Sequence, residues 1–199
     1  MSKLYFRYSA MNAGKTTAIL QVAYNYQERG MKAILVKPAV DTKGGDHIVS
    51  RLNIDRKVDI LLKDEEFVSN MIDLNNKPDA ILVDEAQFLV PEQVDDLYYI
   101  SKEYDIPVLC YGLRCDFQMK PFRAAPRLLE IADDIEELKT ICTCGVKATQ
   151  NLRLVNGEVT FEGGQVAIDG ENNVSYDSVC GKCYIRLRKN WESKRNISR

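Results

Sequence analysis

Largely apolar runs recur along the first 140 residues, and segments with helical spacing or polar loops separate them. The clearest runs are LYFRYS (residues 4–9), KAILVK (32–37), AILVDE (80–85) and VLCYG (108–112). Apolar runs without polar alternation are typical of strands buried on both faces of a parallel sheet. Helical spacing predicts a helix that begins in the loop after the first strand and ends at Gly30, an amphipathic helix at 66–74, and a helix from Pro91 to Tyr104. This alternation predicts an α/β fold with a parallel sheet.

The pattern changes after residue 140. NLRLV (151–155) and EVTFE (158–162) flank Asn156-Gly157, a strong signal for a two-residue hairpin turn, and no further alternation of helices and strands follows. We therefore expect an α/β domain at 1–140, a small β-rich domain at 141–190 and a solvated C-terminal tail at 191–199. The C-terminal region is locally basic, through Arg186, Arg188, Lys189, Lys194, Arg195 and Arg199.

Composition and charge narrow the class of protein. The chain has 199 residues, 45% of them hydrophobic, and a formal net charge of -2, so it can build a sizeable core and has no overall positive field that would attract nucleic acid. No apolar run approaches the roughly 18 residues of a membrane span, and the first residues lack the apolar core of a signal peptide. We expect a cytoplasmic protein without a membrane or nucleic-acid partner.

The stretch SAMNAGKTT (residues 9–17) nearly matches the phosphate loop G-x-x-x-x-G-K-[ST], with Ser9 where the pattern has glycine. In such a loop, backbone N–H groups surround the phosphates of ATP, Lys15 supplies a cation, and the Thr16 hydroxyl holds Mg²⁺. Gly14 lets the chain approach the nucleotide closely. A serine fits the first position if its φ stays negative, so the sequence still predicts an ATP site.

An acidic pair, Asp84 and Glu85, ends the run AILVDE. A phosphate-loop enzyme places a magnesium-binding carboxylate at the end of a second strand, and Asp84 is the candidate. Glu85 follows at once and is the candidate general base for whatever attacks the γ-phosphate. The alternative is an ordinary polar strand end in which Glu85 caps the next turn.

Four cysteines form two close pairs about 35 residues apart, on either side of the predicted hairpin. They are Cys142, Cys144, Cys180 and Cys183. This spacing is typical of a structural Zn²⁺ site with four thiolates. Buried free thiols are the alternative, because disulfides are not expected in a reducing compartment.

Together these motifs resemble the thymidine kinases of the cytosolic, zinc-containing type. The resemblance spans nearly the whole chain and rests on SAMNAGKTT, VDEAQF, GLRCDFQMKPF, LKTICTCG and SYDSVCGKC, in that order. It implies a RecA-like domain, a zinc domain whose lasso loop (163–179) covers a nucleoside, and transfer of the γ-phosphate of ATP to the 5′-hydroxyl of deoxythymidine. It also implies feedback inhibition by dTTP and a homotetramer.

The resemblance further implies roles for particular residues, with Glu85 as the base that takes the 5′-hydroxyl proton. The expected ATP-binding residues are Ser9, Ala10, Met11, Asn12, Ala13, Gly14, Lys15, Thr16, Asp84, Glu85, Ala86 and Gln87. The expected nucleoside-binding residues are Met11, Phe88, Leu113, Phe117 and Tyr176, and Asn151 is a further candidate.

Two departures from the family pattern concern loops. In Asp41-Thr42-Lys43 the third residue is lysine, where relatives often have arginine. An arginine could bind phosphate through two parallel hydrogen bonds, whereas lysine offers a point charge, so the role of Lys43 stays open. The lasso is also longer than usual, which leaves contacts from Ile168 to Val174 open.

Two other classes of function remain as alternatives. DEAQ resembles the acidic box of helicases, but a helicase of that kind needs two RecA-like units and only one fits here. A nucleotide-dependent switch with a zinc ribbon would bind or slowly hydrolyse ATP. A kinase instead consumes ATP in proportion to an added nucleoside.

Overall fold

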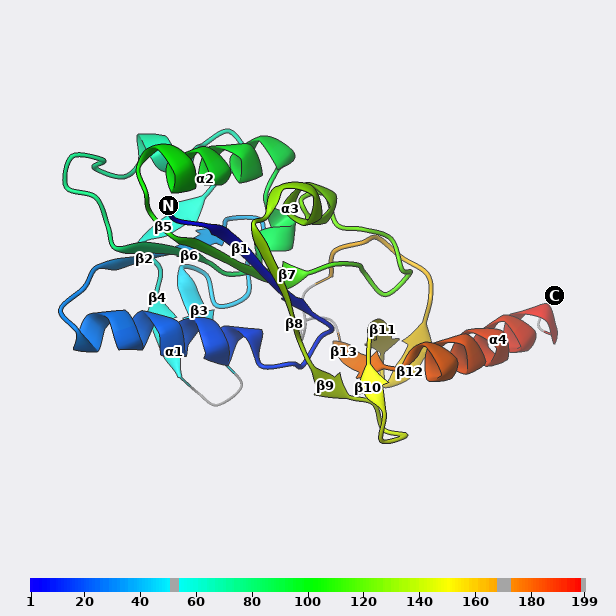
Figure 1. Cartoon of the computed structure of the whole chain (residues 1–199). Helices are drawn as coiled ribbons and strands as arrows, with labels where there is room; N and C mark the ends of the chain where they lie inside the picture. The colour runs from blue at the N-terminus through cyan, green and yellow to red at the C-terminus, as the bar shows by residue number, and fades with distance from the viewer. Residues whose placement is uncertain (51–53, 168–172, 198–199) are drawn as a thin grey trace.

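The first domain is built on one parallel sheet (Figure 1). The computed structural model describes residues 1–50, 54–167 and 173–197. Six strands pair in parallel, in the order β5 (Ile60–Leu62), β2 (Ala33–Pro38), β6 (Ala80–Val83), β7 (Val108–Leu113), β1 (Leu4–Ser9) and β8 (Asp134–Leu138). β7 therefore separates β1, which leads into the phosphate loop, from β6, which leads into the acidic pair. The sheet is the RecA-like sheet that was expected.

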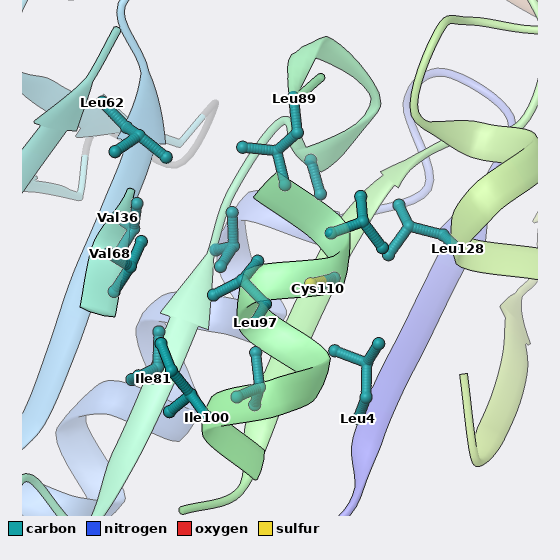
Figure 2. Close-up of a cluster of buried hydrophobic side chains, with 14 of the residues drawn as sticks. Leu4, Val36, Leu62, Val68, Ile81, Leu89, Leu97, Ile100, Cys110 and Leu128 are labelled. Atoms are coloured by element: carbon teal, nitrogen blue, oxygen red, sulfur yellow. The ribbon is translucent and has the colours of Figure 1, made fainter. Parts of the chain in front are cut away.

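Helices cover both faces of the sheet, which explains why its strands are apolar at consecutive positions. α1 (Lys15–Glu28) packs on one face, where Ile19 contacts a cluster that includes Leu35 and Leu82. α2 (Pro91–Glu103) and α3 (Ala125–Ile131) pack on the other (Figure 1). Figure 2 shows Leu97 and Ile100 of α2 in one cluster with Ile81 and Cys110 of the sheet. Successive residues of each central strand thus enter opposite cores.

Two of the predicted helices are confirmed and one is wrong. α1 ends at Glu28 just before Gly30, whose φ is +69°, and α2 starts at Pro91. The helix expected at 66–74 is only a 3-10 turn, η1 (Val68–Asn70). Ser69, Asn70 and Asp73 interrupt this segment with side chains that compete for backbone hydrogen bonds, and the N–H of Ser69 donates to Asp96 rather than within a helix.

The second domain begins with two short hairpin strands, β9 (Thr140–Ile141) and β10 (Lys147–Ala148). It continues with a three-stranded antiparallel sheet in the order β12 (Glu158–Thr160), β11 (Gln150–Val155) and β13 (Val174–Val179). The predicted hairpin is confirmed, with Asn156 and Gly157 at φ +51° and +79° in its turn. A further hairpin, β3 (His47–Val49) and β4 (Asp55–Lys57), follows β2 in the first domain.

A helix that was not predicted from the sequence follows the β-rich sheet. α4 (Gly181–Ile197) includes most of the basic segment that was expected to be a tail, and it projects from the second domain (Figure 1). Tyr184, Leu187 and Trp191 share one face of α4 and pack on the domain core. Phe161 stacks edge-on against Tyr184 and Trp191, with centroid separations of 5.2 and 5.6 Å. The many charges on the exposed face of α4 hid this narrow apolar stripe in the sequence.

Among the described residues, no helix has both the length and the apolar character needed to cross a membrane.

Candidate functional site

The phosphate loop connects β1 to α1 and accommodates Ser9 without strain. Ser9 is the last residue of β1 and pairs with Leu113 and Leu138, so its backbone is extended. The left-handed backbone conformations fall later, at Asn12 (φ +62°) and Gly14 (φ +78°). The position that the pattern reserves for glycine therefore has an ordinary strand conformation here.

The Ser9 hydroxyl has a specific partner in the loop. Lys15 is only 7% exposed, and its Nζ donates to Ser9 Oγ over 3.1 Å. Ser9 Oγ in turn donates to the main-chain oxygen of Ala10 over 2.6 Å. The hydroxyl thus holds the ammonium beside the loop, a contact that glycine cannot make.

The loop encloses a polar cavity at the N-terminus of α1. Its lining is Met11, Asn12, Ala13, Gly14, Lys15, Thr16, Thr17, Lys43, Val49 and Glu85. This lining includes the expected ATP-binding residues from Met11 to Thr16, together with Glu85. Ser9, Ala10, Asp84 and Ala86 are buried and do not belong to it, and Gln87 lines a different cavity. Loop N–H groups, a helix N-terminus and a lysine together form an anion-binding site.

Three carboxylates surround the carboxyl end of β6. Burial, reinforced by the charge of Glu85, raises the pKa of Asp84 to about 7. Burial and Glu85 likewise raise the pKa of Asp41, although Lys37 Nζ lies 3.1 Å from its Oδ2. Clustered carboxylates next to a phosphate site suit a hard divalent cation. Glu85 itself has a left-handed backbone, with φ +49°.

A second, more apolar cavity adjoins the first. Its lining is Met11, Val40, Asp41, Lys43, Glu85, Gln87, Phe88, Leu113, Asp116, Phe117, Phe122, Asn151, Gln165, Val166, Ala167 and Tyr176. All five expected nucleoside-binding residues belong to it, as does Asn151. Met11, Lys43 and Glu85 line both cavities, so a group bound in one faces a group bound in the other across the Glu85 side chain.

Asn151 joins three segments around this second cavity. Its Oδ1 accepts the N–H of Met11 over 2.8 Å, and its Nδ2 donates to the main-chain oxygen of Cys115 over 2.7 Å. The phosphate loop, the segment after β7 and strand β11 are thereby held together. Phe122, which was not assigned a role from the sequence, packs edge-on against Phe88 with centroids 5.5 Å apart.

Sequence reasoning also missed Arg153, which fastens the described part of the lasso. Arg153 is 3% exposed, and its guanidinium carbon lies 3.9 Å from the centre of the Phe117 ring. It donates to the Tyr176 hydroxyl over 2.9 Å and to the main-chain oxygens of Gly164 and Gln165 over 2.7 and 2.9 Å. The contacts of the longer lasso, from Ile168 to Val174, were left open by the sequence. Most of this stretch, residues 168–172, lies outside the described residues.

The four cysteines converge at the base of the second domain. All four sulfur atoms lie within 4.8 Å of one another. Cys144 Sγ is 3.5 Å from Cys142 Sγ and 3.6 Å from Cys180 Sγ. Tetrahedral metal–sulfur bonds of about 2.3 Å require sulfur atoms roughly 3.8 Å apart, so the group fits a metal ion. The N–H of Cys144, more than any other contact, lowers the pKa of the Cys142 thiol to about 6, which favours the thiolate that a metal binds.

The fold and the two cavities indicate the class of this protein. A phosphate loop on a RecA-like sheet, next to a second cavity that shares the Glu85 carboxylate, is typical of phosphate-loop enzymes that act on a small molecule besides the nucleotide. The sequence model of the thymidine kinase family matches residues 2–184. The chain belongs to the thymidine kinase family.

The sequence of this chain aligns with those of individual thymidine kinases over nearly their whole length. The thymidine kinase of Chromobacterium violaceum is 45% identical over 186 residues, which cover 92% of this chain and 98% of that protein. The thymidine kinase of Francisella tularensis subsp. holarctica is 43% identical over 200 residues (96% and 98%), and that of Pasteurella multocida is 48% identical over 184 residues (90% and 95%).

Proposed function

We propose that this chain is an ATP-dependent thymidine kinase, which transfers the γ-phosphate of ATP to the 5′-hydroxyl of deoxythymidine. The observation that carries the proposal is the position of Glu85, which lines both the phosphate cavity and the apolar cavity. A nucleoside in the apolar cavity presents its 5′-hydroxyl to the phosphate loop at that carboxylate. Family membership supports the choice of acceptor.

The reaction divides among the residues of the site as follows. N–H groups of the loop and Lys15 hold the β- and γ-phosphates, and Thr16 and Asp84 are the residues that would hold Mg²⁺. Bound Mg²⁺ neutralises charge on the phosphates. Glu85 takes the proton of the 5′-hydroxyl while the 5′-oxygen of the nucleoside forms a bond to the γ-phosphorus. The bond between the γ-phosphorus and the bridging oxygen breaks, and ADP leaves with that oxygen. A positioned base contributes roughly 10²- to 10⁴-fold in rate.

The apolar cavity supplies both specificity and exclusion of water. Its lining includes Phe88 and Leu113, which would pack on thymine, and Phe117 and Tyr176, which would lie on the side next to the lasso. An apolar pocket with a few polar groups suits a nucleoside, and its closure protects the transferred phosphate from water. Lys43 lines both cavities, which suits contact with the transferring group as a point charge.

The metal proposed for the four cysteines is Zn²⁺, in a structural role. Four thiolates complete a tetrahedral shell and leave no position for substrate. We also propose a cytoplasmic location, a homotetramer and inhibition by dTTP, on the strength of the family resemblance. The rival classes, an ATP-driven nucleic-acid protein or a switch, do not require the apolar cavity.

The experiment measures ADP formation against added nucleoside. We expect one ADP per dTMP formed with deoxythymidine, turnover of deoxyuridine, and little turnover of deoxycytidine or purine nucleosides. Deoxycytidine exchanges donor and acceptor positions on the base edge, and two unpaired polar groups at about 1 to 3 kcal/mol each already give roughly 30-fold discrimination. ATP hydrolysis that ignores nucleosides, or that rises with single-stranded DNA, would contradict the proposal.

A further inference from the structure

The side chain of Gln87 links Glu85 to the end of strand β7. Gln87 is fully buried, and it belongs to the 3-10 turn η2 (Ala86–Phe88) that follows Glu85. Its Oε1 accepts the N–H of Leu113 over 3.0 Å, and its Nε2 donates to Glu85 Oε2 over 2.5 Å. The amide therefore connects a main-chain atom of the sheet to the carboxylate at the junction of the two cavities.

The packing around Gln87 fixes where this amide lies. A Cβ atom on Gly112 would come within 2.8 Å of Gln87 Oε1 and 3.1 Å of its main-chain nitrogen. Real Cβ atoms do not approach other atoms so closely, so only glycine at this position lets Gln87 dock against β7. The docking is thus built into two separate elements of the fold.

The cavity linings separate Gln87 from the phosphates. Gln87 lines the apolar cavity together with Leu113, whereas the residues around the phosphate cavity do not include it. Both polar atoms of its amide already have protein partners. An ATP-binding role for Gln87, expected from the family pattern, therefore has less support from the geometry than a role toward Glu85.

We propose that Gln87 is a positioning residue for the catalytic carboxylate. This inference rests on the proposed function of Glu85 as base. A glutamate side chain has several rotatable bonds, and a base acts efficiently only when its oxygen is held against the reacting hydroxyl. Gln87 holds one oxygen of Glu85, so that the other is presented to the 5′-hydroxyl. Because the anchor is Leu113, the base keeps a fixed position relative to the wall on which the nucleoside packs.

The test is a double-mutant cycle between Gln87 and Glu85. Gln87→Met keeps the approximate shape of the side chain and removes both hydrogen bonds. We expect kcat to fall roughly 10- to 100-fold, as for a misplaced catalytic group, while the KM values for ATP and thymidine stay within about twofold. In a Glu85→Gln background the same substitution should lower kcat by less than about twofold, because the group being positioned is already gone.

Two further variants separate the hydrogen bond from general packing. Gln87→Glu keeps an acceptor for Leu113 but replaces the donor with a carboxylate, and it should lose kcat as Gln87→Met does. Gly112→Ala displaces the amide without changing it, and should show the same kcat loss and little additional loss when combined with Gln87→Met. Thermal unfolding identifies any variant that fails to fold, and a crystal structure of folded Gln87→Met should show the Glu85 carboxylate displaced.

Equal kcat losses in both Glu85 backgrounds would overturn the proposal, as would a large rise in the KM for ATP at unchanged kcat. A Glu85 carboxylate that keeps its position in the Gln87→Met crystal would also overturn it, and this outcome needs no activity. Failure of the proposed function appears differently, as a wild-type chain that does not phosphorylate thymidine.

Discussion

Asn12 of the phosphate loop donates its side-chain N–H to the main-chain oxygen of Tyr176, over 3.2 Å. Tyr176 lies on β13 at the end of the lasso, and its ring lines the apolar cavity. The phosphate loop, proposed to bind ATP, and the lasso, proposed to cover the nucleoside, therefore touch directly. Binding at one site and closure at the other share this contact.

That contact leads to a prediction for Asn12→Gly, which keeps the left-handed backbone and removes the amide. Loss of one hydrogen bond costs about 1 kcal/mol, so we expect the KM for thymidine to rise roughly fivefold. Steady-state kinetics at saturating ATP measure it. Asn25→Ala, which removes an exposed side-chain amide hydrogen bond to Gln21 on α1, is the control and should leave KM unchanged. An unaltered KM in Asn12→Gly would mean that the contact does not couple the sites.

Glu85→Gln should keep ATP binding and lose most phosphotransfer. The amide matches the carboxylate in shape but cannot accept the proton, so kcat should fall roughly 10²- to 10⁴-fold. Lys15→Ala, in contrast, should weaken both ATP binding and turnover. Equilibrium nucleotide binding and single-turnover kinetics separate the two effects, and wild-type turnover in Glu85→Gln would exclude Glu85 as the base.

Arg153→Lys should loosen the lasso although the charge is kept. A lysine cannot donate to Tyr176, Gly164 and Gln165 from one planar group, and it cannot stack on Phe117 as a guanidinium does. We expect the KM for thymidine to rise at least roughly tenfold, from the loss of two hydrogen bonds of about 1 kcal/mol each. Arg188→Lys on the exposed face of α4 is the matched control. Similar KM values for the two variants would refute the fastening role of Arg153.

Ser9→Gly restores the usual phosphate-loop pattern and should change little. Ser9 has an extended backbone and lies outside the phosphate cavity, so we expect kcat/KM for ATP to stay within about threefold of the wild type. The Michaelis parameters for ATP check this expectation. A tenfold loss would show that the Ser9–Lys15 contact has a role in turnover.

The cysteine cluster should bind one zinc ion per chain. Elemental analysis of protein purified without added metal measures the ion, and Cys180→Ala should lose both the metal and several kcal/mol of stability, because metal binding and folding are coupled. Cys110→Ala provides a comparison, since Cys110 is buried in β7, away from the cluster. A metal-free protein of normal stability would rule out the structural role.

Local patterns in the sequence predicted the elements that carry the chemistry. The phosphate loop, the acidic pair and the hairpin at Asn156-Gly157 each depend on a short motif whose geometry the backbone enforces. α4 was missed because its apolar stripe consists of a few residues, among them Tyr184 and Trp191, within a strongly charged segment. The helix expected at 66–74 failed because side-chain competition for the backbone outweighs a weak apolar periodicity.

The site itself could be predicted only in part. The resemblance supplied the residues of the apolar cavity, but the contacts that organise them join distant parts of the chain. Arg153 reaches lasso carbonyls, and Gln87, which follows β6, reaches Leu113 at the end of the neighbouring strand β7. A buried arginine whose partners are main-chain oxygens leaves no charge pattern in the sequence, so such residues emerge only from the fold.

The position of β1 between β7 and β8 has a consequence for synthesis on the ribosome. β1 is made before both of its neighbours, which are Val108–Leu113 and Asp134–Leu138. Pairing across such a separation is slow, because a long loop must close before any contact forms. The nascent chain therefore carries β1 without a partner strand until residue 113 has emerged, and without its second neighbour until residue 138 has emerged. β2 and β6 are closer together in sequence and can pair earlier, so the phosphate loop is encoded first and takes its shape late.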